Sequence, residues 1–176
     1  MAASGGLDVV GAADRLEANA MVFGALVARV TTEQARWKPE PSKWSILEVV
    51  CHIADEEVED FRRRLDLTLH HAGEPWPPID PEGWATSRAY NQQDLTEAIG
   101  RFSSERTRSV TWLRRLGTHD LDLGYQHPKV GLIRAGDLLA SWLDHDWIHI
   151  RQLTRLHHQW LVERARPYGT EYAGGF

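Results

Sequence analysis

The sequence predicts an all-α fold, a four-helix bundle with long connections between its helices. Apolar residues recur in alternating steps of three and four along four segments, which is the spacing of helices that bury one face. No segment alternates apolar and polar residues over a length that suits a sheet. Clusters of proline and glycine separate the four segments and stop each helix.

The first two helices are separated by a pair of prolines. We expect residues 38–41, which contain both prolines, to end the first helix. Ser45 and Glu48 have the form of a capping box, which opens the second helix. Gly73 is its expected stop, and residues 74–84 hold four prolines that cannot continue a helix. The apolar stripe of the first helix consists of Val9, Ala13, Leu16, Ala20, Phe23, Val27 and Val30.

The third and fourth helices follow the same pattern of caps and breakers. Asp94 and Glu97 repeat the capping signal for the third helix, and Gly117 ends it. Residues 117–133 form a second long connection. The fourth helix is expected at about residues 134–160.

Length and composition suit one soluble domain. We expect a single domain over residues 1–176, with its core at about 8–160 and a C-terminal tail at about 161–176. The net charge of −5 argues against a nucleic-acid or anionic-membrane partner, and the longest apolar run is too short to span a bilayer. The lone cysteine, Cys51, and the lack of a signal-peptide pattern indicate a cytoplasmic protein.

The fourth helix carries two histidines where its core should be. They are one turn apart, so both imidazoles can face one ion, although hydrogen bonds among buried neighbours explain the spacing equally well. Leaving them buried and unpaired would cost about 1–3 kcal/mol each. His52, on the inward side of the second helix, adds a third imidazole and shifts the balance toward an open metal site. The core stripe of the fourth helix is Ala135, Leu138, Trp142, His145, His149, Gln152 and Leu156.

Two stretches of the chain resemble the DinB-like superfamily of damage-inducible four-helix proteins. Residues 43–56 contain a Trp-Ser-Ile start followed by a histidine, and residues 143–153 contain a His-Asp-x-x-His-x-x-Gln run. The resemblance extends over about residues 8–160. It implies a bundle with one long crossover, which the proline-rich segment 74–93 suits. It also implies a divalent metal, zinc or nickel, held by the matching residues His52, His145 and His149.

The same resemblance implies a homodimer that acts on a small-molecule substrate. Since some members of the superfamily use low-molecular-weight thiols, and a metal lowers the pKa of a thiol, a thiol transferase is the favoured function. Two alternatives stay open: a metal-dependent hydrolase of a small amide or ester, and a non-catalytic metal-binding dimer in a stress response. Three visible ligands favour chemistry, because structural zinc normally has four.

Glu56, one turn beyond His52, is the candidate catalytic residue, as a general base. In the alternative interpretation, Glu56 has no catalytic role and belongs to an exposed acidic face of the helix, together with Asp55, Glu57, Glu59 and Asp60. Asp146 is expected to contact a neighbouring helix, and Arg106 is expected to form an internal salt bridge rather than to bind an anionic substrate. We expect Cys51 to be a small buried side chain. Gln152 is expected to form a hydrogen bond, either within the site or to the backbone.

Overall fold

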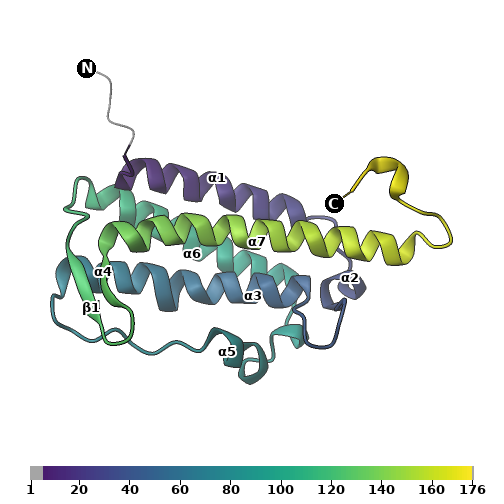
Figure 1. Ribbon diagram of the computed structural model, residues 1–176, viewed down its shortest axis with the longest axis horizontal. Coiled ribbons are helices and arrows are strands. Elements are labelled where there is room, and N and C mark those ends of the chain that lie inside the picture. The colour runs from purple at the N-terminus through teal and green to yellow at the C-terminus, as the bar shows by residue number, and fades with distance from the viewer. Residues whose placement is uncertain (1–5, 176) are drawn as a thin grey trace, which may run out of the picture.

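A computed structural model, which describes residues 6–175, shows a four-helix bundle with one long crossover (Figure 1). The prediction of the fold class is therefore confirmed. A single π-helical turn, η1 (Glu57–Phe61), joins two helices into one continuous run. The long helices are α1 (Val9–Val27), α3 (Ile46–Glu56), α4 (Arg62–His70), α6 (Leu95–Leu116) and α7 (Ala135–Arg164).

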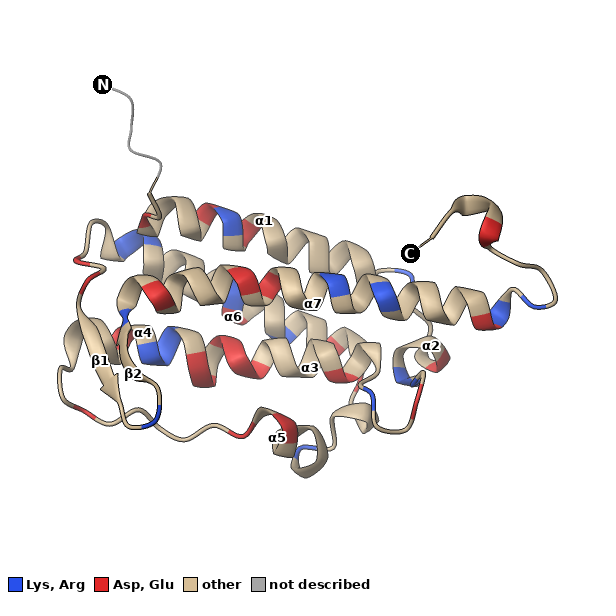
Figure 2. Ribbon diagram, viewed as in Figure 1, with Lys and Arg blue, Asp and Glu red and all other residues tan. Residues whose placement is uncertain are grey.

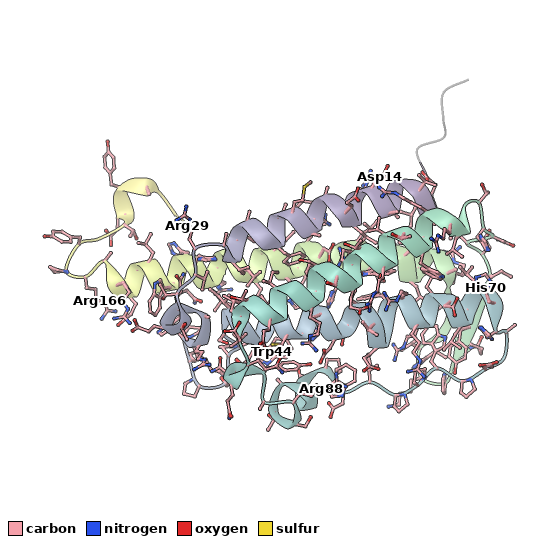
Figure 3. The ribbon with its side chains drawn as sticks, turned by 180° about the vertical axis from the view of Figure 1, so that it is seen from behind. Asp14, Arg29, Trp44, His70, Arg88 and Arg166 are labelled. Atoms are coloured by element: carbon pink, nitrogen blue, oxygen red, sulfur yellow. The ribbon has the colours of Figure 1, made fainter. Side chains whose placement is uncertain are left out.

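The helices pack as a ring around the core. α1 and α3 each pack against both α6 and α7. α1 and α7 run in one direction, and α3, α4 and α6 run in the other (Figure 1). The chain must therefore travel the length of the bundle between α4 and α6, and residues 71–94 are this crossover. Seen from behind, Trp44 and His70 lie toward opposite ends of the α3–α4 run (Figure 3).

Local caps fix where the helices begin and end. The backbone N–H of Ser45 donates to the Glu48 carboxylate at 2.8 Å, and the Glu48 N–H donates to Ser45 Oγ at 3.2 Å, which completes the predicted capping box. Asp94 accepts from the first turn of α6 through Oδ1. Gly117 ends α6 with φ of 63°, a conformation that costs glycine little. Both expected starts and this stop are confirmed.

The connections contain more regular structure than the sequence predicts. A hairpin of β1 (Gly124–His127) and β2 (Gly131–Arg134) occupies the second connection, so the expectation of no strand is wrong there. Its strands are too short to show an alternating pattern, and Gly131, with φ of +85°, forms part of the turn. Shorter helical pieces are α2 (Thr32–Arg36), α5 (Pro81–Ser87), η2 (Tyr90–Gln92) and η3 (Glu171–Ala173).

Two helix ends differ from their expected positions, and one helix was not expected. α1 ends at Val27, well before the proline pair, because the chain turns there into α2. Within the proline-rich segment, α5 begins at Pro81, where proline at the first helical position is favourable. α7 continues to Arg164, so the first residues of the expected tail are helical. None of the helices within residues 6–175 is both long and apolar enough to cross a membrane.

A polar layer crosses the middle of the bundle and separates two apolar clusters. Arg106 of α6 binds both oxygens of Asp146 of α7, at 2.7 and 2.8 Å, and Glu57 Oε1 at 2.8 Å. Asn19 of α1 donates to the same Asp146 carboxylate at 3.0 Å, and Trp142 donates to Glu57 at 3.1 Å. The expected internal salt bridge of Arg106 and the expected contact of Asp146 to neighbouring helices are both confirmed.

The acidic face of the second helix is buried, and the expectation of an exposed face is wrong. Asp55, Glu56, Glu57 and Asp60 are buried, and only Glu59 is partly exposed. Cations from other segments account for much of this burial. For Asp55 they are arginines of the crossover and of α6: Arg88 donates to Oδ2 at 2.6 Å and Arg101 donates to Oδ1 at 2.7 Å.

Candidate metal centre

Three imidazoles from two helices meet in the polar layer. α3 supplies His52, and α7 supplies His145 and His149 from successive turns. His145 Nε2 lies 3.2 Å from His52 Nε2 and 3.1 Å from His149 Nε2. One ring nitrogen from each residue lies within 4.8 Å of the other two. The structure therefore brings together the three histidines that the sequence singles out.

The spacing of these nitrogens suits a shared metal ion better than hydrogen bonds alone. A neutral Nε2 either donates one hydrogen or accepts one, so His145 Nε2 cannot satisfy both of its neighbours at once. Nitrogens bound at about 2.0–2.1 Å to one ion would lie roughly 3.0–3.4 Å apart, depending on the coordination geometry. The two measured separations, 3.1 and 3.2 Å, fall in that range. The donor set fits a divalent transition metal.

Burial keeps the three imidazoles neutral. Removal from water and, to a smaller extent, the nearby His149 lower the pKa of His52 to about 3. The pKa of His145 is lowered to about 2 by burial and then by the other two histidines. Burial also lowers the pKa of His149. All three rings therefore keep a free lone pair near neutral pH, as metal ligands must.

Neighbouring side chains orient two of the rings. Gln152 Oε1 lies 2.8 Å from His149 Nδ1, so this nitrogen donates and Nε2 directs its lone pair toward the other histidines. Gln152 thus hydrogen-bonds within the site, one of the two roles expected for it. The Trp44 ring packs against His52 with the ring centroids 4.8 Å apart. The sequence marks Trp44 only as part of a motif, and its contact with the cluster was missed.

Glu56 lies behind His52 rather than at the centre of the cluster. Its Oε1 is 3.9 Å from His52 Nδ1, the ring nitrogen that faces away from His145. Burial and, after it, the charge of Asp60 raise the pKa of Glu56 to about 8. Within the described residues, the cluster that can hold an ion consists of histidines alone. Glu56 therefore faces His52 from outside the cluster, and in this part of the chain neither Glu56 Oε1 nor His52 Nδ1 has a hydrogen-bond partner.

Cys51 lies outside the cluster, although it is the residue before His52. Its side chain is fully buried, and Sγ donates to Gln93 Oε1 at 3.4 Å. Burial raises the pKa of the thiol to about 12, so the thiolate is negligible near neutral pH. The expectation that Cys51 is a small buried side chain is confirmed.

A hollow of about 240 Å³ lies next to the cluster, between the start of α3 and the C-terminal half of α7. Trp44 and Gln152, which contact two of the histidines, form part of its wall. Lys43 and Arg155 also line it, and neither was predicted from the sequence to have a role. The available signal was the spacing of Gln152, which follows His149 by three residues, and of Arg155, which follows Gln152 by three.

Comparisons with known proteins agree with this architecture. A similar solved structure is YfiT from Bacillus subtilis, described as a probable metal-dependent hydrolase with an unusual four-helix bundle topology. The two share 20% sequence identity and superpose with a TM-score of 0.77, over 90% of this chain and 93% of that one. A search of curated proteins found no match. The family model of the DinB superfamily matches residues 15–153, which is most of the chain, and the chain therefore belongs to the DinB superfamily.

Proposed function

We propose that the protein is a divalent-metal-dependent enzyme whose ion, zinc or nickel, is held by His52, His145 and His149. The observation that carries the proposal is the convergence of three neutral Nε2 atoms, two of the separations being 3.1 and 3.2 Å. Imidazole nitrogen is a good ligand for both metals. Since the cluster contains no carboxylate among the described residues, the protein would leave the full double positive charge on the ion.

Three ligands favour a reactive site over a structural one. Structural zinc is normally enclosed by four protein ligands, whereas catalytic sites keep a position open for a substrate. A divalent ion bound here would lower the pKa of a thiol or of a water that reaches it. The role of the protein chain is then to present three oriented imidazoles and to exclude bulk water from the buried polar layer.

We favour transfer of a low-molecular-weight thiol to a small electrophile. A thiol needs little help from a base once its pKa is lowered, while activation of water is usually assisted by a nearby carboxylate. Glu56 lies on the far side of His52, 3.9 Å from Nδ1, and the described residues bring no other carboxylate into the cluster. This arrangement supports a thiol as the nucleophile.

Hydrolysis of a small amide or ester is the second candidate. It is supported by the likeness to YfiT, a probable metal-dependent hydrolase with the same overall fold. Glu56 also keeps some support as a base, because its raised pKa of about 8 suits proton transfer near neutral pH. Dependence of turnover on an added thiol separates the two reactions.

Metal content tests the site itself. Protein purified without a histidine tag should carry about one equivalent of zinc or nickel by mass spectrometry. Each of the variants His52→Ala, His145→Ala and His149→Ala should carry much less, because two imidazoles chelate more weakly than three. His127→Ala, in the hairpin, is the matched control and should keep the metal. A full equivalent in all three variants would place the site elsewhere.

The same proteins test the reaction. Metal-loaded wild-type protein should accelerate the loss of free thiol when a thiol and a model electrophile such as 1-chloro-2,4-dinitrobenzene are mixed. The histidine variants should lose this acceleration and His127→Ala should keep it. Cleavage of a small ester without any thiol, together with no thiol consumption, would instead favour the hydrolase.

We further propose a cytoplasmic homodimer that binds a small-molecule substrate. Exposed apolar side chains on two adjacent helices support an interface between two copies: Met21 of α1 is 70% exposed and Trp147 of α7 is 58% exposed. The single free and buried cysteine suits a reducing compartment. Sedimentation equilibrium should give twice the chain mass, and Trp147→Glu should reduce it to a single chain.

A further inference from the structure

A groove leads from the histidine cluster along α7. The hollow next to Trp44 shares Gln152, Arg155 and Gln159 with a second hollow of about 850 Å³, which also includes Ile148. Because Gln152 lines both hollows and its Oε1 lies 2.8 Å from His149 Nδ1, the two hollows meet beside the cluster. We refer to this pair of hollows as the α7 groove.

The α7 groove is lined by basic side chains that have no ion-pair partner. Lys43 comes from the segment before α3, and Arg151 and Arg155 come from α7. Within residues 6–175 none of these three side chains forms an ion pair, and Glu40 is the acidic residue on the wall. Figure 2 shows basic bands in the C-terminal half of α7, next to a middle part that is acidic. The groove is positive on a chain of net charge −5.

The basic side chains lie beyond Gln152 as seen from the cluster. Around α7, Gln152 is about 60° from His149, Arg155 is about 120° from it, and Arg151 lies nearly on the opposite side, so the two arginines face the groove rather than the histidines. The rise from His149 to Arg155 is about 9 Å, since six residues each add about 1.5 Å. A small molecule that extends from the cluster past Gln152 would meet Arg155 at its other end.

We propose that the thiol or its acceptor carries an anionic group, a carboxylate or a phosphate, which Arg155 binds with the help of Arg151 and Lys43. This inference rests on the proposed function and names the substrate class of that site. The guanidinium group binds both anions in a two-point geometry. The three cations are exposed, and Arg155 lines both hollows, one with Lys43 and the other with Arg151, so binding depends on two cations sharing one anion rather than on burial.

Four synthetic dipeptides test the proposal by calorimetric titration of the zinc-loaded protein at constant ionic strength. The first is N-acetyl-cysteinylglycine with its free carboxylate, and the second is its C-terminal amide. The third and fourth are the same two molecules with the sulfur methylated. The carboxylate should bind at least about fivefold more tightly than the amide, with or without the methyl group. A phosphonate analogue shows which anion binds more tightly.

Matched variants assign the preference to the groove. Arg155→Gln should reduce the ratio of anion to amide affinity to about one. Arg15→Gln removes the same charge from an exposed position of α1 outside both hollows, and it should leave the ratio unchanged. Equal affinities in the wild type, or a preference that survives in a triple variant of Lys43, Arg151 and Arg155, would overturn the proposal.

Failure of the proposed function gives a different result in the same experiment. The free thiol should bind more tightly than its methylated form only if the sulfur coordinates the ion. The ratio of these two affinities therefore tests the thiol chemistry. A carboxylate preference without a thiol preference would support the anion site and contradict thiol transfer. A thiol preference without a carboxylate preference would support thiol transfer and contradict the anion site.

Discussion

His52 and Glu56 each bury a polar atom that has no hydrogen-bond partner. These atoms, His52 Nδ1 and Glu56 Oε1, are 3.9 Å apart. A buried unpaired group costs about 1–3 kcal/mol, so a small shift that joins the two is favourable. Ligation of His52 through Nε2 leaves the proton on Nδ1, which makes that atom a donor. We therefore expect Glu56 to position His52 when the ion is bound, a role that is compatible with proton transfer by the same carboxyl group.

Substitution of Glu56 separates positioning from a general structural role. Glu56→Gln should keep nearly wild-type zinc affinity, because the amide oxygen also accepts from Nδ1. Glu56→Ala should weaken the affinity about 10–100-fold, the usual effect of removing such a partner. Competition with a chromophoric chelator measures the zinc affinity of each variant. Glu59→Ala, at a partly exposed position one turn away from the site, is the control, and equal affinities in all variants would contradict the role.

The sequence identified the histidines but not the surroundings of the neighbouring acids. Two of the histidines interrupt a regular apolar stripe on one helix, so local spacing reveals them. The burial of Asp55 depends on Arg88 and Arg101, which are 33 and 46 residues away in the chain. The local spacing of residues does not reveal such distant partners. The sequence therefore predicted that the acidic face of the second helix is exposed, which was wrong.

At the scale of elements, the π-helical turn η1 and α6 together build the polar layer. η1 places Glu57 where it accepts from Arg106 of α6 and from Trp142 of α7. The sequence does show Arg106 as a charged residue in an apolar stripe, and its salt bridge was predicted for that reason. The π turn was missed, because a wide turn lacks a residue pattern of its own and follows from packing.

Removal of Arg106 should strongly destabilise the bundle. Arg106→Met leaves two buried carboxylates, Glu57 and Asp146, without their cation, which costs about 3–5 kcal/mol in comparable cases. Denaturant unfolding followed by circular dichroism measures the change. Arg114→Met removes an exposed arginine from the same helix and should have little effect. A loss as small as that of Arg114→Met would contradict the stabilising role of the layer.

At the scale of the whole molecule, the histidine cluster connects α3 to α7, two helices that are far apart in the chain. Their long apolar stripes made the bundle predictable from the sequence. The hairpin and α5 were not predicted, since short elements with little buried surface depend on what they pack against. The stacked rings of Trp76 and Tyr125, with centroids 4.4 Å apart, join the crossover to the hairpin in this way.

Removal of the metal should lower the thermal stability of the entire bundle. An ion that binds only the folded chain adds about 2.7 kcal/mol at a concentration 100 times its Kd. For a chain of this size that corresponds to a fall in Tm of roughly 5–10 °C when a chelator is added. Scanning calorimetry should show the fall and its reversal by zinc. The Tm of His145→Ala should change neither with the chelator nor with zinc. A wild-type Tm that is unchanged by the chelator would contradict an ion that bridges the two helices.

The turn at Glu57–Phe61 has a consequence for insertions and deletions. A π turn holds one residue more than an α-helical path between the same ends. Deleting one residue there would give that α-helical path and keep the two halves aligned, whereas winding all the present residues as a regular α-helix would rotate one half against the other by about 100°. His52 and Leu65, both buried, would then no longer face inward together. The alignment of the ligand with the apolar anchor therefore depends on the wide turn, and loss of one residue from this stretch should disturb it less than loss of the turn at the present residue count.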